Sequence, residues 1–201
     1  MNVEQVMRLA PVIPVLVIED VAHAIPIAEA LVAGGLLALE VTLRTDCAFD
    51  AIRAMSQVEG AVVGAGTVLN PHDLDKAIHA GARFIVSPGL TKPLGKAAIA
   101  SDIAFLPGTA NAGDIMRGLD LGLTHFKFFP AATSGGIPAL KALIGPLGHA
   151  RFCPTGGITQ DSAPDWLAIE QVLCVGGSWL VPKGVPDPAA ITARAKAAAA
   201  L

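Results

Sequence analysis

Short apolar runs alternate with segments of helical spacing along the whole chain. The apolar runs predict eight strands, at residues 12–18, 36–44, 61–67, 83–87, 103–107, 124–129, 150–154 and 172–175. The helical segments lie between them, at residues 22–33, 48–58, 71–80, 92–100, 112–121 and 137–144, and the Ala-rich tail 193–200 predicts a last helix. This alternation is typical of a parallel β/α architecture. The eight strands favour a single α/β domain over residues 1–201, closed as an eight-stranded (β/α)8 barrel, with an open doubly wound sheet as the alternative.

The predicted strand 36–44 carries a carboxylate and a guanidinium on one face. Side chains of a strand alternate between its two faces. The apolar residues 37, 39, 41 and 43 are expected to face the helices, whereas Glu40 and Arg44 are expected to face the barrel interior, with Arg44 nearer the mouth. A buried carboxylate is suited to proton transfer. The alternative is an ion pair between Glu40 and Arg44 that has no catalytic part.

A lysine lies in the middle of the aromatic strand 124–129. Lys127 is placed between two phenylalanines, and His125 shares its face and is expected to pack or to line the pocket floor. Burial favours an uncharged amine, which is the nucleophile that forms a Schiff base with a carbonyl. In the alternative, the stem of Lys127 packs and its ammonium group reaches water. If Glu40 and Lys127 meet, each lowers the cost of burying the other's charge.

Further candidate groups follow other strands, at the edge where the functional groups of such barrels gather. Thr67 ends the third strand, where its hydroxyl can donate to a bound carboxylate. The turns Ser87-Pro88-Gly89 and 107–109 contain glycines that allow a ligand to approach the backbone closely. The alternative is that these turns are simply tight connections between a strand and a helix.

Glycine pairs follow the last two predicted strands. The seventh strand is followed by Thr155-Gly156-Gly157, and the eighth by Gly176-Gly177-Ser178. These two strand ends are where phosphosugar barrels bind phosphate, through backbone N–H groups and a helix N-terminus. A basic side chain is not needed there, because the amides supply the field. The pairs therefore predict a phosphate site, with tight turns as the alternative.

Composition narrows the range of functions. Hydrophobic residues make up 53% of the 201 residues and charged residues 15%, which is typical of elements buried on both faces. The net charge of −3, without a basic patch, argues against nucleic acid as a partner. The apolar stretches are too short for a membrane span, and the N-terminus lacks the features of a signal peptide. We therefore expect a cytoplasmic protein.

Neither metal nor thiol chemistry is predicted. Cys47, Cys153 and Cys174 are expected to be reduced core residues, two of them in apolar strands. The two histidines of segment 71–80 lie beside no carboxylate or cysteine in a ligand pattern. The sequence therefore predicts no metal site.

Six motifs resemble those of a known enzyme family. They occupy residues 40–45, 64–69, 87–89, 127–131, 154–158 and 176–180, in the same order as in the family. On these motifs the chain is similar to the 2-keto-3-deoxy-6-phosphogluconate (KDPG) aldolase and 4-hydroxy-2-oxoglutarate aldolase family. The resemblance implies a (β/α)8 TIM barrel, usually a homotrimer, and a class I aldolase without metal or cofactor. The implied reaction cleaves the phosphorylated keto acid KDPG to pyruvate and glyceraldehyde 3-phosphate.

The resemblance also implies roles for particular residues. Lys127 would form the Schiff base, and Glu40 would act as acid and base. The implied binding residues are Arg44, Thr67, Pro88 and Gly89 for the carboxylate, Gly156, Gly157, Gly176, Gly177 and Ser178 for the phosphate, and Thr155 for the central hydroxyls of the substrate. The chain departs from the family at Ala132, where an acidic residue is expected, and in the loop 108–111. Both departures bear on loop contacts rather than on the chemistry.

Other functions stay open at this point. The aldolase for the C4 epimer, 2-keto-3-deoxy-6-phosphogalactonate, uses the same chemistry, and 4-hydroxy-2-oxoglutarate is a candidate second substrate. A phosphosugar isomerase or epimerase barrel explains the phosphate site but leaves Lys127 unused. A third alternative is a phosphosugar-binding protein without catalytic activity, which would give no role to Lys127, Glu40 and Arg44.

Overall fold

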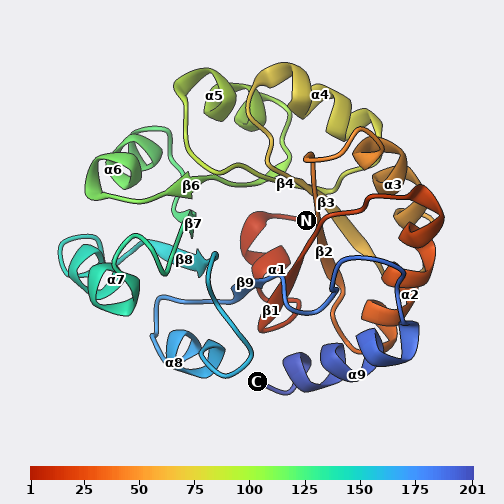
Figure 1. Ribbon diagram of the computed structural model, residues 1–201. Helices are drawn as coiled ribbons and strands as arrows, with labels where there is room; N and C mark the ends of the chain where they lie inside the picture. Colours follow the sequence, from red (N-terminus) through yellow and green to blue (C-terminus); the bar gives the residue numbers. More distant parts are fainter.

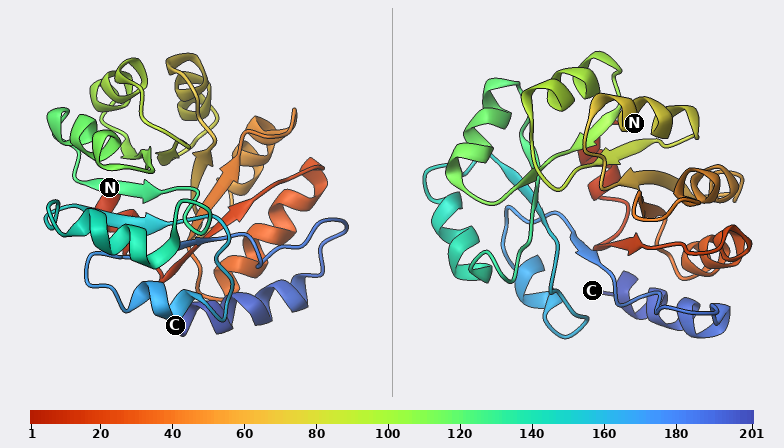
Figure 2. Two further views of the ribbon diagram at one scale, coloured as in Figure 1. Left: turned by 60° about the vertical axis from the view of Figure 1, so that its left-hand side comes forward. Right: turned by 45° about the horizontal axis from the view of Figure 1, so that its top comes forward.

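The computed structural model describes residues 1–201. Its helices are α1 (Val3–Met7), the 3-10 helix η1 (Val21–His23), α2 (Ala24–Ala33), α3 (Ala48–Met55), α4 (Pro71–His79), α5 (Lys92–Ala100), α6 (Ala112–Asp120), α7 (Gly136–Ile144), α8 (Ala163–Leu167) and α9 (Pro188–Ala199). Its strands are β1 (Val12–Leu16), β2 (Ala38–Thr42), β3 (Val62–Gly66), β4 (Phe84–Val86), β5 (Ala104–Leu106), β6 (Gly108–Thr109), β7 (His125–Phe128), β8 (Arg151–Pro154) and β9 (Val175–Gly177). Figure 1 shows the strands in the middle of the molecule with most helices around them, and Figure 2 shows the same arrangement from two other directions.

All strand pairings are parallel. One sheet has the order β5-β4-β3-β2-β1-β9, and the other has the order β6-β7-β8. The two sheets approach each other at both edges. Pro107 alone separates β5 from β6, and single bridges from Thr155 to Gly176 and from Phe152 to Val172 link the other edge. The chain therefore has an α/β fold in which parallel sheets are surrounded by helices.

The predicted helices and strands are present, with shifts at their ends. The predicted strand 103–107 corresponds to β5, which ends before Pro107, since proline has no N–H to donate to a neighbouring strand. The short strand β6, beyond Pro107, was not predicted. The predicted last strand is displaced, because β9 pairs with β1 from Val175 to Gly177 and not over 172–175. The short helices α1 and α8 were not predicted. Each has five residues, which is too short to show a helical period.

Helices that follow the site-bearing strands begin at capping residues. The side chains of Asn70 and Asn111 accept hydrogen bonds from the N–H groups of Asp73 and Asp114, at 2.9 and 3.0 Å. Such caps satisfy N–H groups that a helix leaves unpaired at its start. The caps fix where α4 and α6 begin and so define the turns that follow β3 and β6.

The apolar side chains form two clusters, one on each side of the strands. The larger cluster lies between strands and helices and contains Leu39 and Val41 of β2. The smaller cluster contains Ala38, together with Val6 and Met7 of α1. The prediction that alternate residues of β2 face the helices and the interior is therefore confirmed for these positions. Helix α1 contributes to the inner cluster and thereby covers one end of it.

The three cysteines are free thiols. Cys153 and Cys174 are buried in the inner cluster, as predicted, whereas Cys47 is only half-buried and donates to the carbonyl oxygen of Ile18 at 3.1 Å. A hydrogen bond with Cys153, together with burial, raises the pKa of the Cys174 thiol well above its ordinary value. Because the thiolate is the reactive form of cysteine, Cys174 is unreactive near neutral pH.

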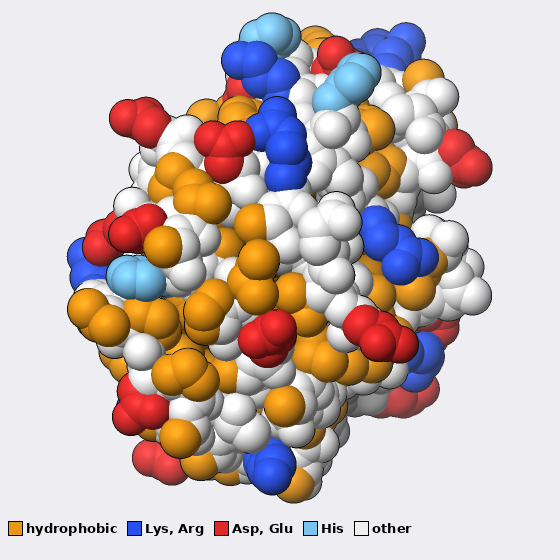
Figure 3. All heavy atoms as spheres, turned by 90° about the vertical axis from the view of Figure 1, so that its right-hand side faces the viewer, with side chains coloured by type: hydrophobic (Ala, Val, Ile, Leu, Met, Phe, Trp, Pro, Cys, Tyr) orange, Lys and Arg blue, Asp and Glu red, His pale blue; other side chains and the backbone are white.

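Apolar and charged side chains share the outer surface. Figure 3 shows the side of the molecule that carries α2 and α3, where apolar side chains gather in the centre and lower part and charges of both signs are scattered among them. None of the helices has the length and apolar character that crossing a membrane requires.

The burial of His125 beside α1 predicts that the folded protein loses stability in mild acid. Its side chain, 14% exposed, lies 3.7 Å from Glu4 of α1, measured from Nε2 to Oε2. Burial lowers the pKa of His125 below its ordinary value of 6.5; Glu4 opposes this shift, and Arg151 and Arg8 add to it. The unfolded chain therefore binds the proton more readily, so this contribution to stability is complete above about pH 6.5 and is lost as the pH falls below it.

We expect His125→Gln to reduce the drop in melting temperature between about pH 7.5 and pH 5.5, because glutamine does not titrate in that range. Thermal melts across this range provide the measurement. His79→Gln, at an exposed position on α4, is the matched control and should leave the drop unchanged. Equal drops in the parent and His125→Gln would show that other groups cause the acid sensitivity.

Candidate active site

Lys127 and Glu40 form a buried ion pair. Lys127 Nζ donates to Glu40 Oε1 at 2.9 Å and to Oε2 at 3.2 Å, and the two side chains are only 7% and 4% exposed. The ammonium group of Lys127 therefore does not reach out to water. The predicted contact between Glu40 and Lys127 is confirmed, and Glu40 pairs with Lys127 rather than with Arg44. An isolated charge at this depth is costly, so each partner depends on the other.

Two neighbouring residues hold this pair in place. The carboxylate of Glu40 lies directly over Gly66 in β3, where a Cβ atom would come within 2.2 Å of Oε1. The Nζ atom of Lys127 lies 5.5 Å from the centroid of the Phe129 ring, a distance at which an ammonium group is attracted to an aromatic face. Sequence analysis did not identify either residue as part of the site. The available signal for Gly66 was a glycine inside a strand, which often marks a close approach of another group.

Arg44 lies outside strand β2. The strand ends at Thr42, and Arg44 follows in the turn, where its side chain is exposed and forms no ion pair. The prediction that Arg44 is part of the strand is wrong, because β2 ends at Thr42 and the two-residue alternation does not extend to Arg44. Its guanidinium group is therefore free at the carboxyl end of β2.

Thr67 directly follows β3 and has an unusual backbone conformation. Its φ angle is +61°, in the left-handed region that β-branched residues rarely adopt. Such strain is found mainly where function requires it. The half-buried Thr67 lies at the same edge of the sheet as the turn that follows β2.

The turn after β4 is held by its own contacts. Ser87 Oγ donates to the carbonyl oxygen of Gly89 at 2.7 Å. On the other side, Gly108 of β6 lies so close to Pro88 that a Cβ atom would come within 2.2 Å of the Pro88 carbonyl group. Gly108 in turn pairs with Lys127, because β6 and β7 are neighbouring strands. The backbone of Pro88 and Gly89 is therefore fixed close to the strand that carries Lys127.

The first glycine pair is tied to the chain that follows Lys127. Gly156 and Gly157 have φ angles of +101° and +76°, which glycine adopts readily. The N–H groups of Ala131 and Ala132 donate to the carbonyl oxygens of Thr155 and Gly156, at 2.8 and 3.0 Å. The N–H group of Gly157 donates no hydrogen bond within the chain. The turn is therefore rigid but keeps a donor available.

The second glycine pair packs against the first. Thr155 is 5% exposed, and a Cβ atom on Gly176 would come within 2.2 Å of its Oγ1. This close approach requires glycine at position 176. Ser178 follows β9, is exposed, and its N–H group donates no hydrogen bond within the chain. The predicted helix N-terminus is absent here, because α8 and α9 begin only at Ala163 and Pro188.

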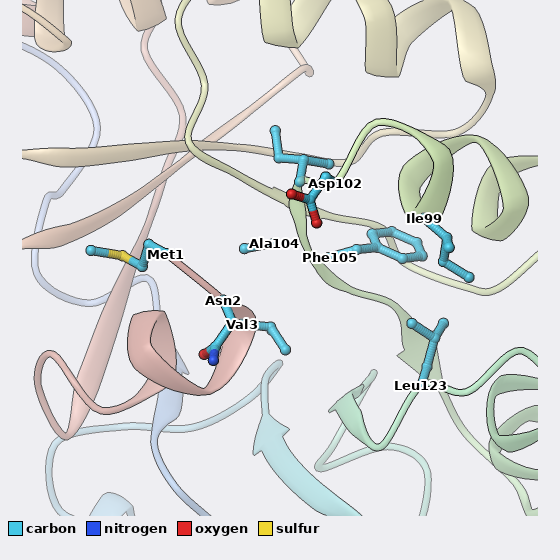
Figure 4. Close-up of a pocket in the computed structure, with 9 residues that line it drawn as sticks. Met1, Asn2, Val3, Ile99, Asp102, Ala104, Phe105 and Leu123 are labelled. Atoms are coloured by element: carbon cyan, nitrogen blue, oxygen red, sulfur yellow. The ribbon is translucent and has the colours of Figure 1, made fainter.

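A separate cleft lies away from these residues. Figure 4 shows its lining, which includes Met1 and Val3 from the start of the chain, Phe105 of β5, and Leu123. The cleft has a volume of about 360 Å³ and contains none of the predicted site residues. Across the chain, the structure brings together no group of three or more His, Cys, Asp or Glu side chains that could hold a metal ion.

A lysine amine paired with a buried carboxylate among parallel strands defines an α/β enzyme of the Schiff-base class. The chain belongs to the aldolase family described as KDPG and KHG aldolase, whose family model matches residues 3–194. The family suggested by the sequence motifs is therefore confirmed.

Individual relatives agree with this assignment. The chain is 64% identical over 199 residues to the 2-dehydro-3-deoxy-phosphogluconate aldolase of Zymomonas mobilis, covering 99% of this chain and 96% of the relative. A crystal structure of the Zymomonas mobilis KDPG aldolase with 3-phosphoglycerate has a TM-score of 0.98, 64% identity, and coverage of 99% and 95%. A KDPG aldolase from Legionella pneumophila, with pyruvate captured as a covalent carbinolamine intermediate, has a TM-score of 0.96, 43% identity, and coverage of 99% and 98%.

Proposed function

We propose that the protein is a class I aldolase that cleaves KDPG to pyruvate and glyceraldehyde 3-phosphate. The buried ion pair between Lys127 and Glu40 is the observation that carries this proposal. The KDPG aldolase relatives and the carbinolamine in the Legionella structure support it. A phosphosugar isomerase or a binding protein would leave this costly buried pair unused, so both alternatives fit the site less well.

We also propose that the strands close into a (β/α)8 TIM barrel that forms a single domain over residues 1–201. With β5 and β6 counted as one interrupted strand, the nine strands become eight. The bridge between Thr155 and Gly176 supports closure between β8 and β9. On the family resemblance we expect a homotrimer in the cytoplasm, and light scattering on the purified protein measures the number of subunits.

The reaction begins at the ion pair. Glu40 accepts the proton of the Lys127 ammonium group at 2.9 Å and leaves a neutral amine. The amine attacks the C2 carbonyl carbon of the keto acid and forms a carbinolamine. Loss of water, with Glu40 returning a proton to the departing hydroxyl, gives an iminium ion. Its positive nitrogen is the electron sink for the next step.

Cleavage uses the same two residues. Glu40 takes the proton of the C4 hydroxyl, the C3–C4 bond breaks, and its electrons move toward the iminium nitrogen. Glyceraldehyde 3-phosphate leaves, and an enamine remains on Lys127. Glu40 then protonates C3, and water hydrolyses the resulting iminium ion to release pyruvate. Each proton that Glu40 takes up is returned, so the residue is unchanged at the end of the cycle.

The substrate carboxylate is bound at the ends of β2, β3 and β4. Arg44 has no ion-pair partner, and its planar guanidinium group can hold both carboxylate oxygens. The Thr67 hydroxyl and the backbone of Pro88 and Gly89 add further contacts. Binding the carboxylate end of the keto acid there directs C2 toward Lys127.

The phosphate is bound by the two glycine pairs at the ends of β8 and β9. The unpaired N–H groups of Gly157 and Ser178 support this proposal. Gly156, Gly176 and Gly177 allow the ligand to approach the backbone, and Thr155 contacts the central hydroxyls. Anchoring the far end of the substrate aligns the reacting end. Because the chemistry at Lys127 does not require phosphate, 4-hydroxy-2-oxoglutarate is a second substrate in this proposal.

Reductive trapping tests the proposed function. Incubation with pyruvate and borohydride should leave a reduced pyruvyl adduct, which peptide mass spectrometry should place on Lys127. Turnover is then measured with KDPG, its C4 epimer and 4-hydroxy-2-oxoglutarate, with KDPG expected to give the highest kcat/KM. Absence of an adduct would exclude Schiff-base chemistry, and preference for the epimer would identify the phosphogalactonate enzyme instead.

Thr67 provides a test of the carboxylate site. A left-handed φ angle costs a residue other than glycine about 1–2 kcal/mol, and Thr67→Gly removes this cost. Glycine also gives the unfolded chain more conformational entropy, which lowers the free energy of unfolding by about 0.4–1 kcal/mol. The free energy of unfolding should therefore rise by no more than about 1.6 kcal/mol. The loss of the hydroxyl should lower kcat/KM by about 10- to 150-fold, the effect of losing a hydrogen bond to a charged group worth about 1.5–3 kcal/mol.

Thr67→Val is the matched variant, since it keeps the branched shape and removes only the hydroxyl. It should show the same loss of kcat/KM without relief of strain. Urea unfolding and steady-state kinetics of both variants provide the measurements. A loss of several kcal/mol in Thr67→Gly with normal kinetics would show that Thr67 has a structural role only.

A further inference from the structure

The segment that follows β9 has no hydrogen bonds to the rest of the chain. From Ser178 to Pro186, neither the backbone nor the side chains take part in a hydrogen bond. By contrast, the first glycine pair is held by the two backbone bonds from Ala131 and Ala132. Gly176 and Gly177 are placed by the pairing of β9 with β1, so it is the position of Ser178, directly after that strand, that depends on side-chain packing.

Trp179 supplies that packing. Its ring lies against Gly177, so that a Cβ atom there would come within 2.2 Å of Cζ3 and 2.6 Å of Cη2. Trp179 is half-buried against the main apolar cluster, and the next residue, Leu180, is wholly buried. Contact between a large rigid ring and a bare backbone restrains both. The indole therefore packs against the backbone at the end of β9, next to Ser178.

The polar end of the indole does not anchor the ring. Trp179 Nε1 is buried and donates no hydrogen bond within the chain. Buried indole N–H groups usually find an acceptor. Because none is present, the orientation of the ring depends on its shape, and a phenyl ring can replace much of the contact with Gly177.

We propose that Trp179 is a positioning residue that fixes the Gly177–Ser178 backbone for the substrate phosphate and so sets the preference for phosphorylated over non-phosphorylated substrates. This inference rests on the proposed aldolase function. Trp179 contacts the backbone that binds the ligand and takes no part in the proton transfers. Its effect therefore falls on phosphate binding and leaves the chemistry at Lys127 and Glu40 intact.

Steady-state kinetics of Trp179 variants separate this role from a general loss of structure. Trp179→Ala should raise KM for KDPG by about 10-fold with little change in kcat. This pattern is expected when a variant loses binding energy that the substrate and the transition state share equally. KM for 4-hydroxy-2-oxoglutarate should stay within about 2-fold, since that substrate has no phosphate. Trp179→Phe should restore most of the affinity for KDPG. Trp166→Phe, on α8, is the matched control and should leave both KM values unchanged.

Fluorescence gives a second test that leaves Trp179 in place. The chain has two tryptophans, so Trp166→Phe makes Trp179 the sole indole. Titration of this variant with glyceraldehyde 3-phosphate should give a saturable change in emission. The variant Trp179→Phe, in which only Trp166 remains, should give none. Because this experiment does not disturb the packing at Gly177, it stays decisive if Trp179→Ala fails to fold.

The outcomes distinguish this inference from the proposed function. If pyruvate trapping on Lys127 fails in the parent, the aldolase function is wrong. If trapping succeeds but Trp179→Ala raises KM equally for both substrates, or if Trp179 emission does not respond, the positioning role is wrong. If Trp179→Phe is as impaired as Trp179→Ala, the explanation by ring packing is overturned.

Discussion

Replacing Lys127 with alanine is expected to lower kcat by at least about 10⁴-fold and to abolish borohydride trapping of pyruvate. Without the amine no iminium ion forms, and breakage of the C3–C4 bond then has no electron sink. The loss should appear in kcat rather than in KM, because the carboxylate and phosphate sites lie on other strands. Turnover of KDPG and mass spectrometry of the trapped protein provide the measurements.

Lys127→Arg is the matched control for folding. Alanine leaves the carboxylate of Glu40 buried without a partner, which costs about 3–5 kcal/mol. Arginine keeps a positive charge opposite Glu40, but its guanidinium group does not form a Schiff base. The arginine variant should therefore melt close to the parent and still be inactive. Lys141→Ala, at an exposed position on α7, should keep full activity. An adduct that persists in Lys127→Ala would place the Schiff base on another lysine.

Replacing Glu40 with glutamine is expected to lower kcat by about 10²–10⁴-fold, the usual effect of losing an acid–base group. Glutamine has nearly the same size, so it fits over Gly66 and can still accept a hydrogen bond from Lys127. It cannot take a proton from the lysine or from the C4 hydroxyl. Trapping of pyruvate should continue at a slower rate, since the amine itself is still present.

Glu29→Gln, at an exposed position on α2, controls for the loss of a negative charge and should leave kcat unchanged. Lys127 in Glu40→Gln keeps a buried amine without a full counter-charge, so kinetics must be measured well below the melting temperature of that variant. Activity within a few-fold of the parent would show that Glu40 only balances the charge of Lys127. The proton transfers would then belong to another group or to water.

The glycine pairs show where local sequence is informative about binding. Gly156 and Gly157 need positive φ angles, and Gly176 leaves room for Thr155, so each glycine has a backbone reason that sequence can signal. The expectation of a helix N-terminus beside them was wrong, because an irregular segment precedes α9. Its attachment through Trp179 could not be predicted, since packing without hydrogen bonds leaves no local pattern.

The sequence by itself determined the order of strands and helices, the faces of β2 on which Leu39, Val41 and Ala38 lie, and the family. These features depend on periodicity, capping and short motifs, which act between residues that are close along the chain. The sequence also placed a carboxylate and an amine in neighbouring parts of the expected interior. The chemical groups of the site can therefore be inferred from the sequence, whereas their geometry cannot.

Only the tertiary structure decided how these parts meet. Glu40 and Lys127 are 87 residues apart, and their contact at 2.9 Å depends on the curvature of the sheets and on the space above Gly66. Arg44 lies in an exposed turn rather than in the strand because β2 ends two residues earlier. Strand ends and distant contacts are set by the packing of all elements together, for which a local pattern carries no signal.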